Sequence, residues 1–227
     1  MTQPARSTGE PTPVVVLVSG SGTNLQSLLD AAAAPGYPAR IAVVVSNVPG
    51  VRALERATLA GVPTRVLPHQ GYPDRVAYDR ALVETIAPFG CRIACLAGFM
   101  RLVGPTFLRA FPGGVLNVHP ALLPSFPGLH AHRQALEHGV KLTGCTVHLV
   151  DEGTDTGPIV AQAAVPVLDA DTEDSLQRRI QEQEHRLFPL ALGLLASGRL
   201  RVEGRRVHVE GGGPDPAGLA LVNPGRL

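Results

Sequence analysis

The chain of 227 residues is long enough for one large domain or two small ones, and 44% hydrophobic with 17% charged residues is typical of a globular protein. Its formal net charge of +1 gives no strong field for nucleic acid or an anionic membrane, and 4% aromatic residues argues against a base-stacking surface. Three cysteines do not make a disulfide framework and no apolar run reaches the roughly 20 residues that span a bilayer, so we expect a cytoplasmic protein.

The first predicted element follows a polar segment, residues 1–13, that we expect to be a flexible tail. Val14–Val18 is an aliphatic run typical of a strand buried on both faces of a parallel sheet. Ser19-Gly20-Ser21-Gly22-Thr23-Asn24 follows at once, and apolar residues at helical spacing then predict an amphipathic helix from Leu25. A strand, a glycine turn and a helix together offer backbone N–H groups to an anion.

The glycine turn does not have the pattern of a dinucleotide site. Leu25 stands where the third glycine of that fingerprint would be, and the second predicted strand, 41–45, is followed by Ser46-Asn47 and not by an acid. The pattern therefore favours a single phosphate bound at residues 22–24. The alternative is a tight turn before a capped helix.

The strand and helix pattern continues with helices predicted at 51–60 and 74–87 and strands at 64–67 and 93–97. Arg75 lies near a helix start, where a cation gains nothing from the helix dipole, so it either faces a ligand or is simply solvated. Residues 98–103 follow a strand and either line a pocket or belong to the core.

The fifth predicted strand, 115–118, leads to an asparagine and a histidine. Asn117 and His119 are two residues apart, so their side chains leave the same face of an extended segment, and Pro120 keeps His119 extended. Three features, at residues 22–24, 98–103 and 117–119, now follow predicted strands, and ligands bind outside the carboxyl ends of the strands in doubly wound sheets. We therefore expect one α/β domain, residues 14–209, with a Rossmann-like, doubly wound, mostly parallel sheet covered by helices on both faces.

The next segment contains His130 and His132, which without a carboxylate at ligand spacing indicate a site rim and no metal. Strands are predicted at 143–150 and 159–165. The loop between them holds three acids, Asp151, Glu152 and Asp155, and is either a solvated turn or presents one carboxylate inward.

The last long helix begins with Asp171-Thr172-Glu173-Asp174 and ends near Gly198, with a kink expected at Pro189. The spacing of its polar residues Gln181, Glu184 and His185 predicts that they form a solvent-exposed face. A hairpin is predicted over residues 199–209, and 210–227 is expected to be a flexible tail.

Asn117, His119 and Asp155 together suit acyl transfer. A carboxylate beside an imidazole raises its pKa, and a cationic histidine with an asparagine amide makes two donors for an oxyanion. The histidine can also pass a proton between an incoming and a departing nitrogen. No serine or cysteine is an evident nucleophile, so the nucleophile is expected to come from the substrate.

Several motifs resemble those of the phosphoribosylglycinamide formyltransferase family. The resemblance covers roughly residues 14–209 and rests on five segments: 19–26, 96–101, 117–124, 127–130 and 155–158. It implies transfer of a formyl group from 10-formyltetrahydrofolate to the amine of glycinamide ribonucleotide in purine biosynthesis. The Asn-x-His-Pro run with the downstream aspartate is specific to folate-dependent formyltransferases.

Site roles follow from the resemblance alone. His119 would be the proton donor, Asn117 would hold the oxyanion, and Asp155 would raise the histidine pKa. The residues implied to bind the ribonucleotide are Gly22, Thr23, Asn24, Gln181 and Glu184. The residues implied to line the folate site are Arg75, Met100, Arg101, Leu102, Val103, Asn117, Asp151, Glu152, Gly153, Thr154 and Asp155.

Other functions were weighed against this one. A relative that formylates methionyl-tRNA would need a further C-terminal domain, and a formyltetrahydrofolate hydrolase typically has an extra N-terminal one. A non-catalytic phosphoribosyl-ligand binding protein would not need Asn117, His119 and Asp155. The sequence does not decide the oligomeric state, for which a homodimer is one alternative. Small departures from the family, Ser125-Phe126 and Thr154, concern loop packing and leave the chemistry unchanged.

Overall fold

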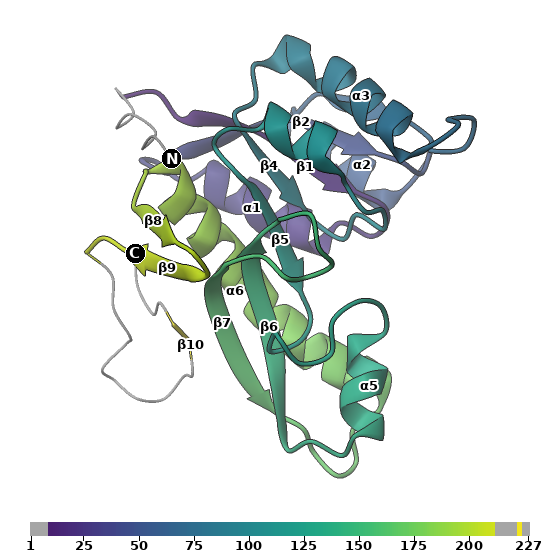
Figure 1. The fold of residues 1–227 in the computed structure, drawn as a ribbon, viewed down its shortest axis with the longest axis vertical. Helices are drawn as coiled ribbons and strands as arrows, with labels where there is room; N and C mark the ends of the chain where they lie inside the picture. Colours follow the sequence, from purple (N-terminus) through teal and green to yellow (C-terminus); the bar gives the residue numbers. More distant parts are fainter. Residues whose placement is uncertain (1–8, 212–221, 224–227) are drawn as a thin grey trace.

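The computed structural model describes residues 9–211 and 222–223, which form an α/β fold around one large sheet (Figure 1). The sheet has eight strands in the order β10-β7-β6-β5-β4-β1-β2-β3, and β8 and β9 pair separately. The strands are β1 (Thr12–Val18), β2 (Ala39–Ser46), β3 (Thr64–Val66), β4 (Ile93–Leu96), β5 (Val115–His119), β6 (Leu142–Leu149), β7 (Ile159–Pro166), β8 (Leu200–Glu203), β9 (Arg206–Val209) and β10 (Val222–Asn223). The helices are α1 (Thr23–Ala32), α2 (Arg52–Leu59), α3 (Arg75–Ile86), the short 3₁₀ helix η1 (Ala87–Phe89), α4 (Pro105–Ala110), α5 (Ala131–Glu137) and α6 (Glu173–Ala196).

The strand order explains why ligands are expected at one edge of the sheet. β1 pairs in parallel with both β2 and β4. The chain runs outward from β1 to β2 and β3 and then returns to form β4 on the other side of β1, so the strand order reverses between β1 and β4. β4 pairs in parallel with β5, whereas β6 and β7 are antiparallel. The carboxyl ends of β1, β4 and β5 therefore meet at a topological switch point. The predicted doubly wound, mostly parallel sheet is confirmed.

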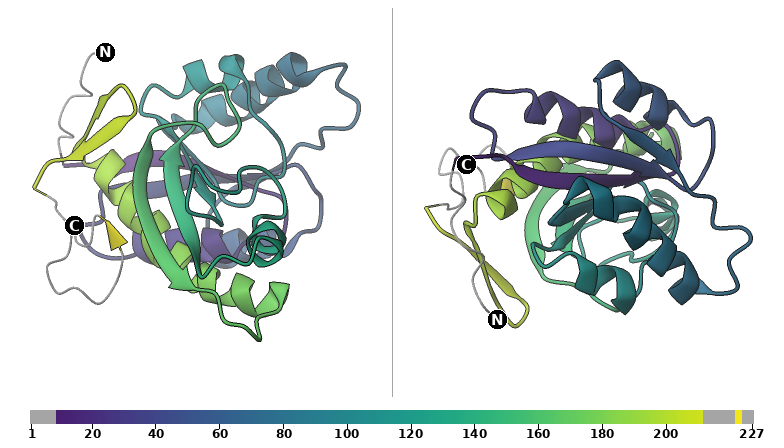
Figure 2. Two further views of the ribbon diagram at one scale, coloured as in Figure 1. Left: turned by 60° about the horizontal axis from the view of Figure 1, so that its bottom comes forward. Right: turned by 90° about the horizontal axis from the view of Figure 1, so that it is seen from above.

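Helices cover both faces of the sheet, as Figures 1 and 2 show. The alternation of β1 divides the core in two: Val14, Val16 and Val18 pack with α1, α2 and α6, whereas Val15 and Leu17 pack with α3 and α4. Strands buried on both faces must be aliphatic throughout, which is why 14–18 contains no polar residue. Helix α4 was not predicted, because its six residues, which begin at Pro105, are too few for a helical repeat.

The predicted last helix is α6, which begins with a capping box between Thr172 and Ser175. It is continuous through Pro189 and spans 24 residues to Ala196. Its apolar stripe crosses one face of the sheet, and its middle turn faces the start of α1. This packing brings the predicted polar patch of α6 beside the glycine turn.

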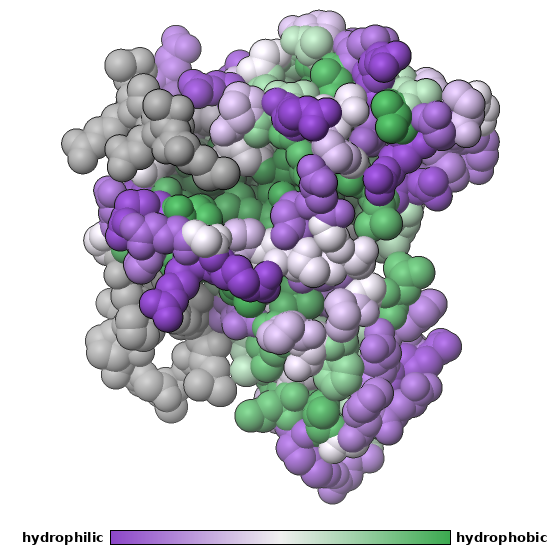
Figure 3. Space-filling view, viewed as in Figure 1, coloured by the Kyte–Doolittle hydropathy of each residue, from purple (hydrophilic) through white to green (hydrophobic). Residues whose placement is uncertain are grey.

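The ends of the chain lie partly outside the described residues. Strand β1 begins at Thr12, within the predicted N-terminal tail, and residues 1–8 are not described. In the predicted C-terminal tail, Val222 and Asn223 form β10 and pair with β7. Among the described residues, no helix combines the length and apolarity needed to cross a membrane. Figure 3 shows hydrophilic residues over the upper helices and the lower tip, with hydrophobic ones in a recessed area between.

Gly22→Ala is expected to destabilise the fold more than a matched glycine change. Gly22 has a φ of +71°, and a Cβ there would lie 2.6 Å from the Ala53 Cβ of α2. Gly36 has a φ of +81° with no atom within 4 Å of its would-be Cβ. Gly36→Ala should therefore cost only the left-handed backbone penalty of about 1–2 kcal/mol, and Gly22→Ala clearly more. Urea unfolding of both variants tests this, and equal losses would show that the α2 contact is unimportant.

Candidate active site

The predicted pair at the end of β5 is completed by a histidine from β6. Asn117 is directly opposite His148 in the antiparallel register of β5 and β6, and the Asn117 Nδ2 donates to His148 Nε2 at 3.1 Å. The other ring nitrogen, Nδ1, donates to the Leu149 carbonyl at 3.0 Å. His148 Nε2 also lies 3.6 Å from Asp155 Oδ1, so this ring contacts both the amide and the carboxylate of the cluster. One N–H of Asn117 is thus used to fix the amide, and the second is left for a ligand.

His119 is the last residue of β5 and is only 4% exposed. Its Nε2–H donates to the Phe126 carbonyl at 2.8 Å, and its Nδ1 lies 3.4 Å from Asp155 Oδ2. Both ring nitrogens therefore face oxygen acceptors. Only the doubly protonated imidazolium can donate to both of them.

Burial lowers the pKa of His119 below its ordinary value, although the Asp155 carboxylate and the Phe126 carbonyl both oppose this effect. Asp155 raises the pKa of His119, as predicted, but burial lowers this pKa by more. A negative charge that develops beside the ring would act in the same direction as Asp155 and favour the cation.

Asp155 comes from the loop between β6 and β7 and has a left-handed backbone with φ of 54°. Its Oδ2 accepts from the Gly128 N–H at 2.8 Å, which ties this loop to the segment after β5. Burial alone would raise the pKa of the Asp155 carboxyl, but His148, Gly128 N–H and His119 together hold it below its ordinary value. The carboxylate is therefore charged near neutral pH and faces two histidines.

The glycine turn contacts α6 through two hydrogen bonds that join four of the predicted residues. Gln181 Nε2 donates to Thr23 Oγ1 at 2.8 Å, and Asn24 Nδ2 donates to Glu184 Oε2 at 2.8 Å. Gly22 is the buried N-cap of α1, and no side chain caps this helix. The first backbone N–H groups of α1 are thus available to an anion.

Glu184 is 7% exposed, so the prediction from residue spacing that it lies on a solvent-exposed face of α6 is wrong. Burial raises the pKa of Glu184, and the hydrogen bond from Asn24 opposes this only in part. A buried carboxyl with one amide partner is costly to the fold. Such a group is a candidate for ligand contact.

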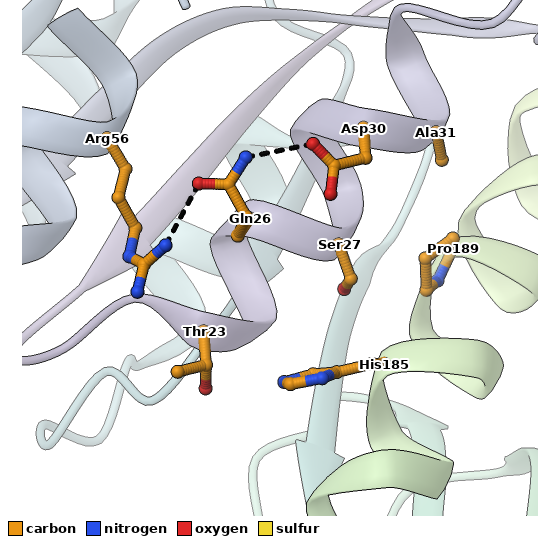
Figure 4. Close-up of a pocket in the computed structure, with 8 residues that line it drawn as sticks. All are labelled: Thr23, Gln26, Ser27, Asp30, Ala31, Arg56, His185 and Pro189. Carbon is orange, nitrogen blue, oxygen red and sulfur yellow. Dashed lines mark hydrogen bonds between the residues drawn. The ribbon is translucent and has the colours of Figure 1, made fainter. Parts of the chain in front are cut away.

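A cavity of about 550 Å³ lies between α1 and α6 beside this turn (Figure 4). Arg56 and His185 stand on either side of the Thr23 end of α1. Arg56 donates through Nε to the Ser21 carbonyl at 2.9 Å and through Nη1 to Gln26 Oε1 at 3.0 Å. The guanidinium therefore holds the glycine turn in place from outside and adds positive charge to it.

Comparison with known proteins agrees with this geometry. The model of the formyl transferase family matches residues 12–192. The chain belongs to the formyl transferase family.

Individual relatives narrow the comparison. The phosphoribosylglycinamide formyltransferase of Escherichia coli (strain K12) is 42% identical over 207 residues, which are 91% of this chain and 98% of that protein. The trifunctional purine biosynthetic protein adenosine-3 of Drosophila pseudoobscura pseudoobscura is 52% identical over 190 residues, and the match spans 83% of this chain but only 14% of that protein. A crystal structure of glycinamide ribonucleotide transformylase 1 from Symbiobacterium toebii superposes with a TM-score of 0.86 at 53% identity, covering 89% of this chain and 95% of that one.

The remaining predicted residues of this formyl transferase lie on two loops and at the start of α3. Met100 is 65% and Leu102 59% exposed, Arg101 is exposed, and Val103 is buried in the core. Arg75 is the exposed first residue of α3. In the acidic loop, Asp151 Oδ1 accepts from Gly153 N–H at 3.1 Å and from Thr156 Oγ1 at 2.6 Å, while Glu152 and Thr154 are exposed.

Sequence reasoning missed two buried polar residues that contact the predicted site segments. His148 was hidden in a strand pattern, although alternation with the buried Thr146 places both on one face of β6. Asp79 is a buried carboxyl in α3 that accepts from Gly104 N–H at 2.7 Å. A charged residue in the middle of an apolar helix face was the available indication. Among the described residues, no group of three or more His, Cys, Asp or Glu is arranged to hold a metal ion.

Glu184→Gln is expected to stabilise this formyl transferase near neutral pH. Burial raises the pKa of the Glu184 carboxyl in the folded state. Its contribution to stability is therefore complete below the pKa of the unfolded state and is lost as the pH rises through the pKa of the folded state. Glutamine does not ionise, so the variant does not lose this stability at high pH. The melting temperature at pH 8 should rise by about 2–4 °C for each kcal/mol by which the free energy of unfolding increases, and this rise should vanish near pH 4. Calorimetry at both pH values measures this. Glu182→Gln, at an exposed site on α6, is the control, and a gain independent of pH would contradict the assignment to Glu184.

Proposed function

We propose that this chain transfers the formyl group of 10-formyltetrahydrofolate to the amine of glycinamide ribonucleotide, the phosphoribosylglycinamide formyltransferase step of purine biosynthesis. The observation that carries the proposal is the cluster of Asn117, His119 and Asp155 at the edge of the sheet that also holds the phosphate-type glycine turn. The identity to full-length relatives of that name supports it.

The reaction begins with attack of the ribonucleotide amine on the formyl carbon. A carbon–nitrogen bond forms, and the formyl oxygen becomes an oxyanion that the second N–H of Asn117 and the His119 ring stabilise. The bond to the folate nitrogen then breaks. The amine loses the proton that the departing folate nitrogen gains, and His119 carries it between them.

The Phe126 carbonyl accepts the hydrogen bond of His119 Nε2. We infer that a substrate oxygen takes over this hydrogen bond when it binds. Phe126 has a left-handed backbone with φ of 54°, which is unfavourable for a residue with a side chain.

The ribonucleotide is assigned to the α1 side of the site. Its phosphate lies at Gly22, Thr23 and Asn24, where free backbone N–H groups and the helix dipole favour an anion. Gln181 and Glu184 face the ribose and the glycinamide portion. The Glu184 carboxylate is a fitting acceptor for the reacting amine.

The folate is assigned to the β4 side. Met100 and Leu102 offer exposed apolar surface for its ring system, and Arg75 and Arg101 are exposed cations suited to its carboxylates. The loop 151–155 closes this part of the site, and Val103 supports it from the core. Cytoplasmic location remains a prediction, as does the assembly state, for which a homodimer is one alternative.

His119→Ala is expected to lower kcat by at least roughly 10²-fold, because it removes both a proton carrier and an oxyanion donor. Formation of tetrahydrofolate is followed spectroscopically with both substrates present. Omitting the amine is the control, since folate turnover in water alone would identify a hydrolase. His208→Ala, on the separate β8–β9 hairpin, should keep full activity. A His119→Ala variant with near-normal turnover would overturn the catalytic assignment.

Asn24→Ala is expected to weaken ribonucleotide binding by about tenfold, because it removes the partner of Glu184 and a polar group of the phosphate turn. Calorimetric titration with glycinamide ribonucleotide measures the affinity. Folate affinity should be unchanged. Equal affinity of variant and wild type for the ribonucleotide would remove the phosphate turn from the proposal.

A further inference from the structure

Ser19 lies between the two proposed substrate sites. It is the first residue after β1 and the last before the glycine turn. Its hydroxyl donates to Asn47 Oδ1 at 2.6 Å and accepts from the Met100 N–H at 2.8 Å. Because a backbone N–H can only donate, the hydroxyl proton is committed to Asn47 and both bonds have a fixed direction.

These two bonds join the carboxyl ends of three neighbouring strands. Asn47 follows β2 and is 4% exposed, so it is a fixed acceptor. Met100 belongs to segment 98–103, which follows β4 and carries the exposed Met100, Arg101 and Leu102. Ser19 thus links the backbone of that segment to the start of the glycine turn.

The far end of the same segment is held by a different residue. The Gly104 N–H donates to Asp79 Oδ2 at 2.7 Å, and Asp79 is 1% exposed. A Cβ at Gly104 would lie 2.8 Å from that oxygen, so the two elements are in close contact. Asp79 ties the segment to α3, on the folate side. Ser19 ties it to the ribonucleotide side.

We propose that Ser19 is a positioning residue that sets the folate-lining segment 98–103 against the glycine turn, so that the two bound substrates are aligned for transfer. The inference rests on the proposed function. Ser19 acts through the backbone of Met100 and does not itself contact the reacting atoms. Direct transfer between two bound molecules depends on their alignment, and displacements of about 1 Å are costly.

The test is steady-state kinetics of Ser19→Ala with each substrate varied in turn. Loss of the hydroxyl frees the Met100 N–H, so kcat/KM for 10-formyltetrahydrofolate should fall about 3- to 10-fold, the size expected for one hydrogen bond. The KM for glycinamide ribonucleotide should stay within about twofold, because the contacts of Thr23 and Asn24 with α6 remain. Ser19→Thr, which keeps the hydroxyl, should restore folate kinetics to within about twofold.

Ser27→Ala is the matched control. Its hydroxyl donates to the Asn24 carbonyl within α1 at 2.8 Å, and among the described residues it makes no hydrogen bond to segment 98–103. This variant should leave folate kinetics unchanged. Ser19→Cys keeps the shape and weakens both bonds, so it should show the same asymmetry if Ser19→Ala does not fold.

Two results would overturn the inference. One is an unchanged kcat/KM for folate in Ser19→Ala, and the other is a rise in KM of equal size for both substrates together with a lower melting temperature, which indicates a purely structural role. Failure of the proposed function is distinguishable, because the wild-type chain would then not transfer formyl groups to the ribonucleotide at all.

Discussion

The pairing of β5 with β6 is the constraint on which the active site depends. Its antiparallel register places Asn117 opposite His148 and His119 opposite Thr146. A shift by one residue would turn all of these side chains to the other face of the sheet. Thr146 also holds the segment after β5, since its hydroxyl donates to the Ala121 carbonyl at 2.7 Å and accepts from the Leu123 N–H at 3.0 Å. One strand pair therefore fixes both the reactive groups and the loop beside them.

Charge in this site is balanced over a buried cluster of polar groups. Asp155 is anionic and lies near two histidines: His148, whose Nε2 is 3.6 Å from Asp155 Oδ1, and His119, whose pKa is lowered by burial. The site thus holds a carboxylate beside an imidazole that burial makes harder to protonate. Negative charge on a transferring group would complete the balance by favouring protonated His119. Arranged dipoles of this kind stabilise charge without reorganisation during the reaction.

On the side proposed for the ribonucleotide, the buried contact between Asn24 and Glu184 lowers the stability of the fold. Glu184 is buried with a single amide partner and would be replaced by an apolar residue if packing alone were selected. The helix start at Gly22 has no side-chain cap. Both features leave hydrogen-bonding capacity that a phosphate and an amine can use. On the side proposed for the folate, the surface is apolar with flanking arginines, which suits a flat ring with an acidic tail.

The sequence by itself determined the α/β class, the order of most elements and the glycine turn, because these depend on local periodicity and on backbone freedom at Gly22. It also placed Asn117 and His119 on one face of an extended segment. Only the tertiary structure decided that His148 joins them, that Glu184 is buried, and that Ser19 contacts Met100. Those contacts join residues far apart in the chain, and spacing along the chain does not encode strand register or helix docking. The net pKa of His119 was likewise out of reach, because it depends on how deeply the folded chain buries the ring.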